Sequence, residues 1–273
     1  MKINFFCPRW GSENLNWNEF FEKVKNAGYD GVEWAIAKEV SRNEIERVLE
    51  ISKLYELKII AQHFDTNDSN FEEHLKIYNK WLEKVSGLPF YCINSQTGKD
   101  FFSKEQNQIL IAEAKKSEIK IGIPIYHETH RNKFSFAAHI TEKFLEENQE
   151  LKLTLDASHW VNVAESYLDD QQKAMNLALE RTEHIHARIG HTEAAQVSDP
   201  FAPEWNDALE KHLNWWDAII KRKIIEGESQ ISITPEFGPA PYMFVLPYTK
   251  QPVVDQWNIN ERMLHFLKNR YQD

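Results

Sequence analysis

The sequence predicts an α/β protein that folds as a single (β/α)8 barrel, or TIM barrel, with residues 1–273 as one domain. Short apolar runs alternate with longer amphipathic stretches eight times along the chain, as in parallel strands joined by helices. The length of 273 residues fits one such barrel, which typically takes about 250 residues. A doubly wound open sheet is the rival, but the sequence has no G-x-G-x-x-G motif to support it.

The apolar runs are short, as expected for parallel strands that are covered on both faces. The eight expected strands are residues 3–6, 31–36, 58–64, 90–94, 120–128, 152–156, 184–189 and 231–236. The stretches between them carry apolar residues on one face, which suits helices that cover a barrel. The eight expected helices are residues 17–26, 43–56, 71–85, 104–117, 136–148, 171–179, 204–222 and 255–268.

Chemical signals at several boundaries support these elements. Gly28 follows a helical stretch and can adopt the left-handed conformation that ends a helix. Ser103 stands three residues before Gln106, which is the spacing of a capping box at a helix start. Two long irregular segments, 191–203 and 238–252, follow late strands. We expect both on the face where barrel enzymes hold their active sites.

The amino-acid composition argues against several classes of binding partner. The formal net charge is −10 and no basic stripe is present, which argues against nucleic acid, since phosphate contacts need a basic surface. Only two cysteines occur, too few for a disulfide scaffold. No apolar stretch is long enough to span a membrane, and no targeting segment is visible. We therefore expect a cytoplasmic protein without membrane or nucleic-acid partners.

Polar side chains mark the ends of the last four expected strands. Side chains alternate between the two faces of a strand, so residues two apart point the same way. On strands six to eight the aliphatic residues share one parity, which suits the helix layer, and the polar residues share the other. Four polar residues, one per strand, then converge at the carboxyl mouth of the barrel: Glu128, Asp156, His186 and Glu236.

Three carboxylates directed at one small volume repel each other or take up protons unless a cation joins them. Carboxylate oxygens with one imidazole suit Mn2+, Co2+ or Mg2+, and Zn2+ is the other candidate. Each residue taken alone is equally well explained as a solvated charge or a hydrogen-bonded histidine. Together, at four strand ends with one parity, they predict a single divalent metal ion.

Five short motifs on strands two and five to eight follow one another along the chain: Gly31-Val32-Glu33, His127-Glu128-Thr129-His130, Asp156-Ala157-Ser158-His159, His184-Ile185-His186 and Pro235-Glu236-Phe237. In this order they resemble the xylose isomerase-like superfamily of barrels. That superfamily is the sugar phosphate isomerase/epimerase group, which includes the tagatose and psicose 3-epimerases and endonuclease IV. The resemblance covers essentially the whole chain and is fairly specific for fold and metal site, but only weakly specific for substrate.

The resemblance implies that Glu128, Asp156, His186 and Glu236 bind the metal and that Glu128 and Glu236 also move protons on opposite faces of a sugar. It implies a small carbohydrate substrate, isomerised or epimerised through an enediolate, in a group whose members are often homo-oligomers. It also assigns a substrate contact to His159. The epimerases place an arginine some residues beyond the strand-seven histidine; this sequence has no clear match, and Arg188 is the candidate substitute.

Parity places further residues near the mouth. His63 at the end of strand three and Glu33 with Trp34 on strand two are expected as substrate contacts, with a structural position as the alternative. His127 and His184 are expected to be structural. Four aromatic residues near strand ends or in late segments are candidates for lining a pocket: Trp10, Phe64, Trp160 and Trp257.

Two other functions stay open. A metal-dependent hydrolase or lyase of the endonuclease IV branch would use several zinc ions and more histidine ligands. Candidates for these are His63, His127, His130, His159 and His184. The third possibility is a barrel that binds a sugar without turnover. The number of metal ions per chain separates the first alternative from an epimerase, and isotope exchange into the substrate separates the second.

Overall fold

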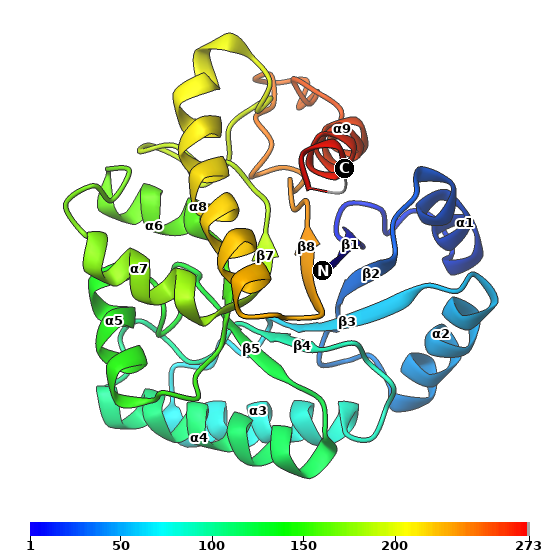
Figure 1. Ribbon diagram of the computed structural model, residues 1–273. Coiled ribbons are helices and arrows are strands. Elements are labelled where there is room, and N and C mark those ends of the chain that lie inside the picture. The colour runs from blue at the N-terminus through cyan, green and yellow to red at the C-terminus, as the bar shows by residue number, and fades with distance from the viewer. Residues whose placement is uncertain (272–273) are drawn as a thin grey trace.

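Eight parallel strands close into a barrel in a computed structural model that describes residues 1–271. Each strand pairs with the next in the sequence, and β8 pairs with β1 to complete the circle. This confirms the predicted (β/α)8 fold (Figure 1). The strands are β1 Lys2–Pro8, β2 Gly31–Ala35, β3 Lys58–His63, β4 Ile93–Ser95, β5 Ile125–Glu128, β6 Leu153–Leu155, β7 Thr182–His186 and β8 Gln230–Thr234.

The helices form a ring around these strands (Figure 1). They are α1 Trp17–Ala27, α2 Arg42–Leu54, α3 Phe71–Val85, α4 Lys104–Ile121, α5 Ala138–Glu147, α6 Ala157–Ala164, α7 Gln172–Arg181, α8 Asn206–Ile225 and α9 Gln256–Tyr271, with the short 3-10 helix η1 Pro203–Trp205 before α8. None of the helices in residues 1–271 is long and apolar enough to cross a membrane.

Several predicted boundaries were wrong. The helix α4 continues to Ile121 because no helix breaker stands before Gly122, which ends it with φ 69°, so β5 begins at Ile125 and not at residue 120. The strand β4 starts at Ile93, and β7 runs from Thr182 to His186, two to three residues earlier than expected. The helix α6 was missed altogether. Asp156 begins this helix by accepting a hydrogen bond from the Ser158 N–H.

The predicted helix caps are present. Ser103 and Gln106 form a capping box at the start of α4, with reciprocal side-chain and backbone bonds. Gly28 ends α1 with φ 88°, the left-handed conformation that glycine adopts without strain. These local signals set the ends of helices that in turn hold the strand ends at the mouth.

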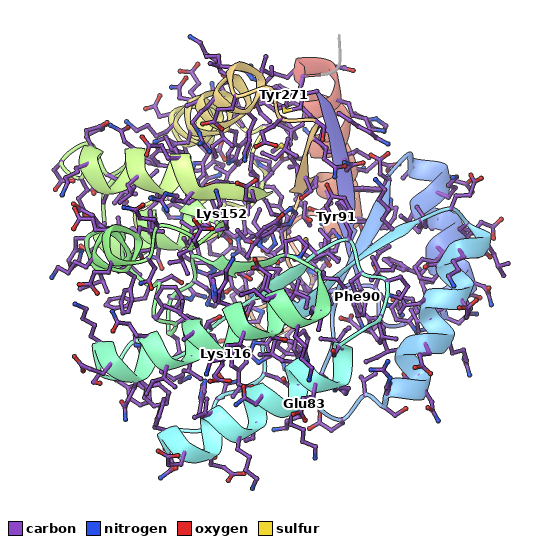
Figure 2. The ribbon with its side chains drawn as sticks, turned by 60° about the horizontal axis from the view of Figure 1, so that its bottom comes forward. Glu83, Phe90, Tyr91, Lys116, Lys152 and Tyr271 are labelled. Atoms are coloured by element: carbon purple, nitrogen blue, oxygen red, sulfur yellow. The ribbon has the colours of Figure 1, made fainter. Side chains whose placement is uncertain are left out.

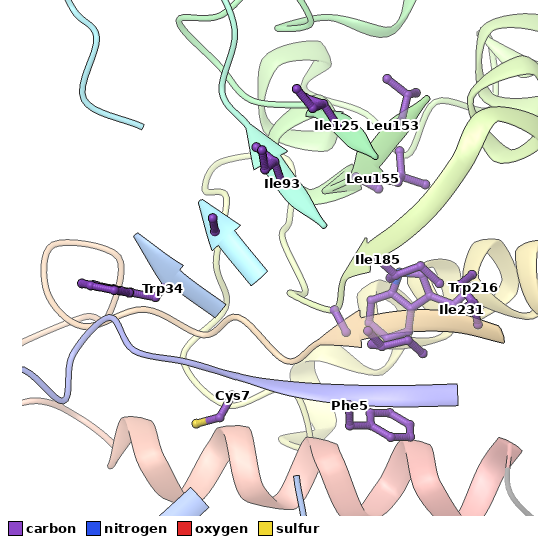
Figure 3. Packing of buried hydrophobic residues seen from close by; sticks show 14 of the residues in the cluster. Phe5, Cys7, Trp34, Ile93, Ile125, Leu153, Leu155, Ile185, Trp216 and Ile231 are labelled. Atoms are coloured by element: carbon purple, nitrogen blue, oxygen red, sulfur yellow. The ribbon is translucent and has the colours of Figure 1, made fainter. Parts of the chain in front are cut away.

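Strand parity divides the core into two layers. Outward-facing side chains such as Phe5 and Cys7 point toward α9, and Ile185 and Ile231 lie near Trp216 of α8 (Figure 3). A separate inner cluster of Phe6, Ile60 and Cys92 is fully buried within the barrel. Because the two layers alternate along each strand, the inward residues nearest the carboxyl ends face the mouth.

The amino end of the barrel is closed by hydrogen bonds between polar side chains. Asn4 donates to Gln230 at 3.1 Å and to the Tyr91 hydroxyl at 3.3 Å, and it accepts from the Lys58 ammonium at 2.9 Å. Tyr91 lies in the segment that leads into β4 (Figure 2). This plug leaves the opposite, carboxyl end as the open face of the barrel.

We expect the Ser103→Ala substitution to lower the free energy of unfolding by about 1 kcal/mol, because it removes the side-chain acceptor that caps α4. Urea unfolding followed by circular dichroism measures this loss. Ser117→Ala, in the same helix but away from its ends, is the matched control and should change the stability little. Equal losses in the two variants would contradict the role of the capping box.

Candidate metal centre

Four side chains from consecutive strands meet at the mouth of the barrel. Glu128 ends β5, Asp156 directly follows β6, His186 ends β7 and Glu236 stands two residues beyond β8. Each offers one ligand atom, and these atoms all lie within 4.8 Å of one another. All four residues are buried. The structure therefore brings together the set that strand parity indicated.

The imidazole of His186 is held from behind by Glu33. The Nε2 atom lies 3.0 and 3.1 Å from the two carboxylate oxygens of Glu33. The Nδ1 atom lies 2.9 Å from Glu236 Oε2 and 3.8 Å from Glu128 Oε1. Burial opposes protonation of His186, but Glu236, Glu33 and Glu128 outweigh it and raise the pKa of the ring well above its usual value. Without a cation the ring therefore donates from Nε2 to Glu33 and from Nδ1 to Glu236, and a metal ion would take the place of the Nδ1 proton. A carboxylate behind a histidine is the usual way in which proteins orient a metal ligand.

Glu33, which was expected as a substrate contact, does not line the cavity above the site. It is buried beneath the four residues, and its carboxylate also accepts from Asn94 at 2.8 Å and from the Thr234 hydroxyl at 2.6 Å. Burial opposes its ionisation, but the neighbouring His186 and His184 outweigh this and hold the pKa of Glu33 well below its usual value. It is thus a fixed negative charge below the site.

The residues present fit a divalent metal ion. Within residues 1–271, His186 Nδ1 and Glu236 Oε2 are buried and lie 2.9 Å apart as an ion pair. Burial raises the pKa of Glu128 to about 7, and the nearby Glu236 and Asp156 carboxylates add to this rise. A divalent cation among these atoms would replace the His186 proton and relieve the repulsion between the carboxylates.

Three amide side chains surround Glu128 and were missed in the sequence. Asn94 Nδ2 donates to Glu128 Oε2 at 2.9 Å, and Gln96 Nε2 lies 3.2 Å from both carboxylate oxygens. Gln62 Nε2 lies 3.3 Å from Glu128 Oε2 and 3.4 Å from Glu236 Oε1. Strand parity could have identified Gln62 as an inward residue, because it follows the inward Ile60 by two residues. In the structure it pairs in register with Asn94.

Arg188 places a permanent cation inside this acidic cluster. Its guanidinium forms an ion pair with Asp156 and has Nη1 3.6 Å from Glu236 Oε2. It also donates to the Ser158 hydroxyl at 3.2 Å and lies 4.6 Å over the ring of Tyr242. The side chain is almost fully buried, yet it borders the cavity above the site. Arg188 therefore neutralises part of the charge that a metal would also neutralise.

His159 does not line the cavity, although a substrate contact was expected. It is fully buried, with Nε2 2.8 Å from Arg188 Nη2. Its ring centre is 3.9 Å from that of His130, which does border the cavity. The histidine that borders the cavity here is His130, and His159 contacts both His130 and Arg188.

His63 was placed on the wrong side of its strand. Ile60 and Gln62 point inward, so His63 at the end of β3 points outward, where it packs 4.8 Å from Tyr78 and 5.0 Å from Trp81. Its Nε2 atom is 2.7 Å from the Thr66 hydroxyl. Burial lowers the pKa of His63 well below its usual value. His63, which was expected as a substrate contact, therefore does not line the cavity above the site.

Two other histidines have the structural positions that parity indicated. His184 Nδ1 lies 2.7 Å from the Ser232 hydroxyl, and His127 Nδ1 lies 2.7 Å from that of Thr97. Among the aromatic candidates, Trp10 and Phe64 border the cavity, whereas Trp160 is fully buried in the core.

A cavity of about 620 Å³ lies directly above the four residues. This volume is in the range of about 300–1,000 Å³ that is typical of small-molecule sites. Glu128, Glu236 and Arg188 reach it from below. Its other lining residues are Arg9, Trp10, Glu13, Trp17, Trp34, Ala35, Val40, Glu44, Gln62, Phe64, Gln96, His130 and Tyr242.

No protein-family model and no curated protein matches the sequence, but solved structures with the same fold exist. D-allulose 3-epimerase from Methylomonas sp. is 14% identical, with a TM-score of 0.62 over 98% of each chain. The probable 3-DHS dehydratase AsbF from Bacillus anthracis is 16% identical, with a TM-score of 0.60 over 98% of this chain and 100% of that one. A sugar phosphate isomerase/epimerase from Parabacteroides distasonis is 12% identical, with a TM-score of 0.60 over 98% of this chain and 93% of that one. These likenesses confirm the fold that the resemblance implied.

We expect Glu33→Gln to weaken Mn2+ binding by about 10- to 100-fold, because it removes the carboxylate that orients His186. Isothermal titration calorimetry measures the affinity. Glu13→Gln is the matched control, since Glu13 borders the cavity outside the donor set and should leave the affinity unchanged. An unchanged affinity in Glu33→Gln would contradict the orienting role.

We expect Arg188→Met to bind Mn2+ about tenfold more tightly, because loss of one nearby positive charge favours a cation at the site. Asp156 keeps its orientation without Arg188, since its Oδ1 accepts from the Ser158 N–H at 3.0 Å and from the Ser158 hydroxyl at 2.5 Å. The same titration measures this gain, and thermal unfolding should show that the metal-free variant is less stable.

Arg131→Met is the control for the Arg188 substitution. The Arg131 guanidinium also lies over Tyr242, at 5.0 Å, but is in no ion pair with the donor set among the described residues. Its affinity for Mn2+ should match that of the unchanged protein. Weaker binding in Arg188→Met would mean that Arg188 holds Asp156 in position and does not compete with the metal.

Proposed function

We propose that the chain is a divalent-metal-dependent sugar isomerase or epimerase that moves a proton at a carbon beside a carbonyl group. The observation that carries the proposal is the buried donor set of Glu128, Asp156, His186 and Glu236, two members of which, Glu128 and Glu236, line a large cavity. A ketose, an aldose or a related polyol ketone is the substrate class. The metal is one ion, with Mn2+, Co2+ or Mg2+ favoured over Zn2+.

A bound divalent ion would supply positive charge that stabilises the negative charge on two adjacent substrate oxygens in an enediolate. The chain supplies the proton transfers. Glu128 and Glu236 both border the cavity, and both lie within hydrogen-bond reach of the Gln62 amide, so their carboxylates lie close together. One carboxylate takes the proton from carbon, and the other returns a proton to the neighbouring or opposite position.

The surroundings of Glu128 and Glu236 shift the pKa values of these two carboxylates in opposite directions. Burial raises the pKa of Glu128 to about 7, so it can both hold and release a proton near neutral pH. Burial also opposes ionisation of Glu236, but His186 and Arg188 outweigh it and lower the pKa of Glu236. These pKa directions hold for the metal-free site, and a bound divalent ion would lower the pKa of both carboxylates. We assign the two proton transfers to this pair.

Arg188 and His130 are the groups placed to hold substrate oxygens, together with the amides of Gln62 and Gln96. All four border the cavity beside the two glutamates. Support from the comparisons is of one kind: an enzyme named D-allulose 3-epimerase and one named sugar phosphate isomerase/epimerase share this fold over nearly the whole chain.

Two further groups of donor atoms favour the multi-metal hydrolase. Glu33 and His184 form one with His186, which already belongs to the four-residue set, and Glu128, His130 and His159 form the other; in each group the donor atoms lie within 4.8 Å of one another. However, the Arg188 guanidinium already lies 2.8 Å from His159 Nε2, and burial lowers the pKa values of His130 and His159 well below the usual value. A second cation there would meet the guanidinium. The number of metal ions per chain, measured by elemental analysis, separates the proposals: one ion for the epimerase and two or three for the hydrolase.

A lyase shares the first step with an epimerase, and a probable 3-DHS dehydratase has the same fold. Both reactions begin when a base removes the proton beside a carbonyl. A lyase then expels a hydroxyl group from the next carbon, whereas an epimerase returns the proton. Mass spectrometry of the product distinguishes them, since loss of water lowers the mass and epimerisation in H2O leaves it unchanged.

We expect the metal-loaded protein to introduce deuterium from D2O at carbon in one member of a panel of ketoses, aldoses and inositol-type ketones. Glu128→Gln and Glu236→Gln should each reduce this exchange by at least about 100-fold, because an amide cannot carry the proton. Proton NMR of the substrate measures the exchange. Glu44→Gln, a carboxylate at the cavity but outside the donor set, is the control and should retain it.

Retained exchange in either glutamine variant would contradict the assignment of two proton-transferring glutamates. Tight binding of a sugar without exchange, at full metal occupancy, would favour the sugar-binding barrel over the enzyme.

A further inference from the structure

The cavity above the metal centre has two walls of different chemistry. The polar wall comes from β3 to β8 and includes Gln62, Gln96, His130 and the two glutamates, with Phe64 and Tyr242 as its aromatic members. The other wall comes from the first two strand and helix units and carries Trp10, Trp17 and Trp34. Trp34 stands at the carboxyl end of β2 (Figure 3). A simple sugar held by the polar wall would leave these indole rings without any part of the ligand to contact.

The indole rings are fixed in place by the protein. Trp17 and Trp34 pack edge to face, with ring centres 4.8 Å apart. Trp10 packs edge to face on Tyr242 at 5.2 Å, and it lies so close to Gly238 that a Cβ there would be 2.2 Å from the ring. Glycine at this position is what allows the ring to lie against the backbone. Rings that are ordered in advance bind another ring at low entropic cost.

The aromatic wall has no cation free to bind an anion among the described residues that line it. Its arginine, Arg9, donates to the carbonyl oxygens of Ser12 at 2.5 Å and Leu15 at 2.6 Å, and its guanidinium lies 4.6 Å over Trp17. The other charged residues of this wall are Glu13 and Glu44, both exposed. A phosphate group on this side of the cavity would meet two carboxylates, so the charge disfavours it.

We infer that the substrate is an uncharged sugar derivative that carries a second ring, either an aryl group or another sugar, stacked on Trp10 of the aromatic wall, and is not a sugar phosphate. This inference rests on the proposed function, since it assumes that the reacting sugar is held at the metal centre. The Arg9 guanidinium covers the Trp17 ring and Trp34 is buried, so the half-buried Trp10 is the indole that we assign to the stacking contact. The volume of about 620 Å³ leaves room for both rings, and an indole face suits an aryl ring or the C–H face of a sugar without a counter-charge.

The test compares the binding of three probes to the Mn2+-loaded protein: glucose, glucose 6-phosphate and phenyl β-D-glucopyranoside. Isothermal titration calorimetry measures the affinities, and indole fluorescence reports contact with the tryptophans. We expect the phenyl glucoside to bind about tenfold more tightly than glucose, as one aromatic contact allows. Glucose 6-phosphate should bind no more tightly than glucose. Equal binding of the phenyl glucoside and glucose, or preference for the phosphate, would overturn the inference.

Trp10→Ala should abolish the advantage of the phenyl glucoside. Trp257→Ala is the matched control, because Trp257 is also half-buried but does not border this cavity, and it should keep the advantage. An advantage that persists in Trp10→Ala would overturn the stacking contact. The double variant Glu13→Gln with Glu44→Gln alters only exposed side chains and so avoids loss of folding. It should improve glucose 6-phosphate binding severalfold and leave phenyl glucoside binding unchanged; no improvement would contradict the charge argument.

These measurements are independent of turnover. If no panel sugar exchanges deuterium but the phenyl glucoside keeps its advantage, the proposed reaction fails and the ligand class stands. If a free ketose exchanges deuterium and the phenyl glucoside has no advantage, the ligand class alone fails.

Discussion

The mouth of this barrel is organised around one electrostatic constraint: three carboxylates share a buried volume in which their donor atoms lie within 4.8 Å of an imidazole and of one another. Such a group needs positive charge or hydrogen-bond donors on every side. The protein supplies amides around Glu128 and a guanidinium beside Asp156. His186 pairs with Glu236 at 2.9 Å, and this pair lies within the group of donor atoms that could hold a cation.

Much of the fold and the meeting of the four donor residues could be predicted, because parallel strands end at one face and side chains alternate along them. The convergence depends only on parity near strand ends, so it survived errors of several residues in the limits of β5 and β7. His63 shows the limit of this reasoning. His63 is the last residue of β3 and points to the outer layer. An error of one residue in the parity of this strand was enough to predict it at the mouth.

Other features depend on relations between strands, which one sequence does not contain. Gln62, Asn94 and Gln96 look like ordinary neutral residues until the register of β3 against β4 brings two of them beside Glu128. Glu33 likewise has its role through residues about 150 positions away in the chain. The helix α6 was hidden because Asp156 ends a strand region and caps the helix at the same time.

The order of the cavity walls along the chain has an evolutionary consequence. The indole wall is built before residue 45, whereas the four donor residues all lie after residue 127, on the last four strands. Exchange or mutational drift of the first two loops can therefore change which ligands fit the cavity, while the four donor residues stay unchanged. A lineage built on this layout could diversify its ligands by changes in its first two loops alone, as long as Glu33 on β2 is kept to hold His186.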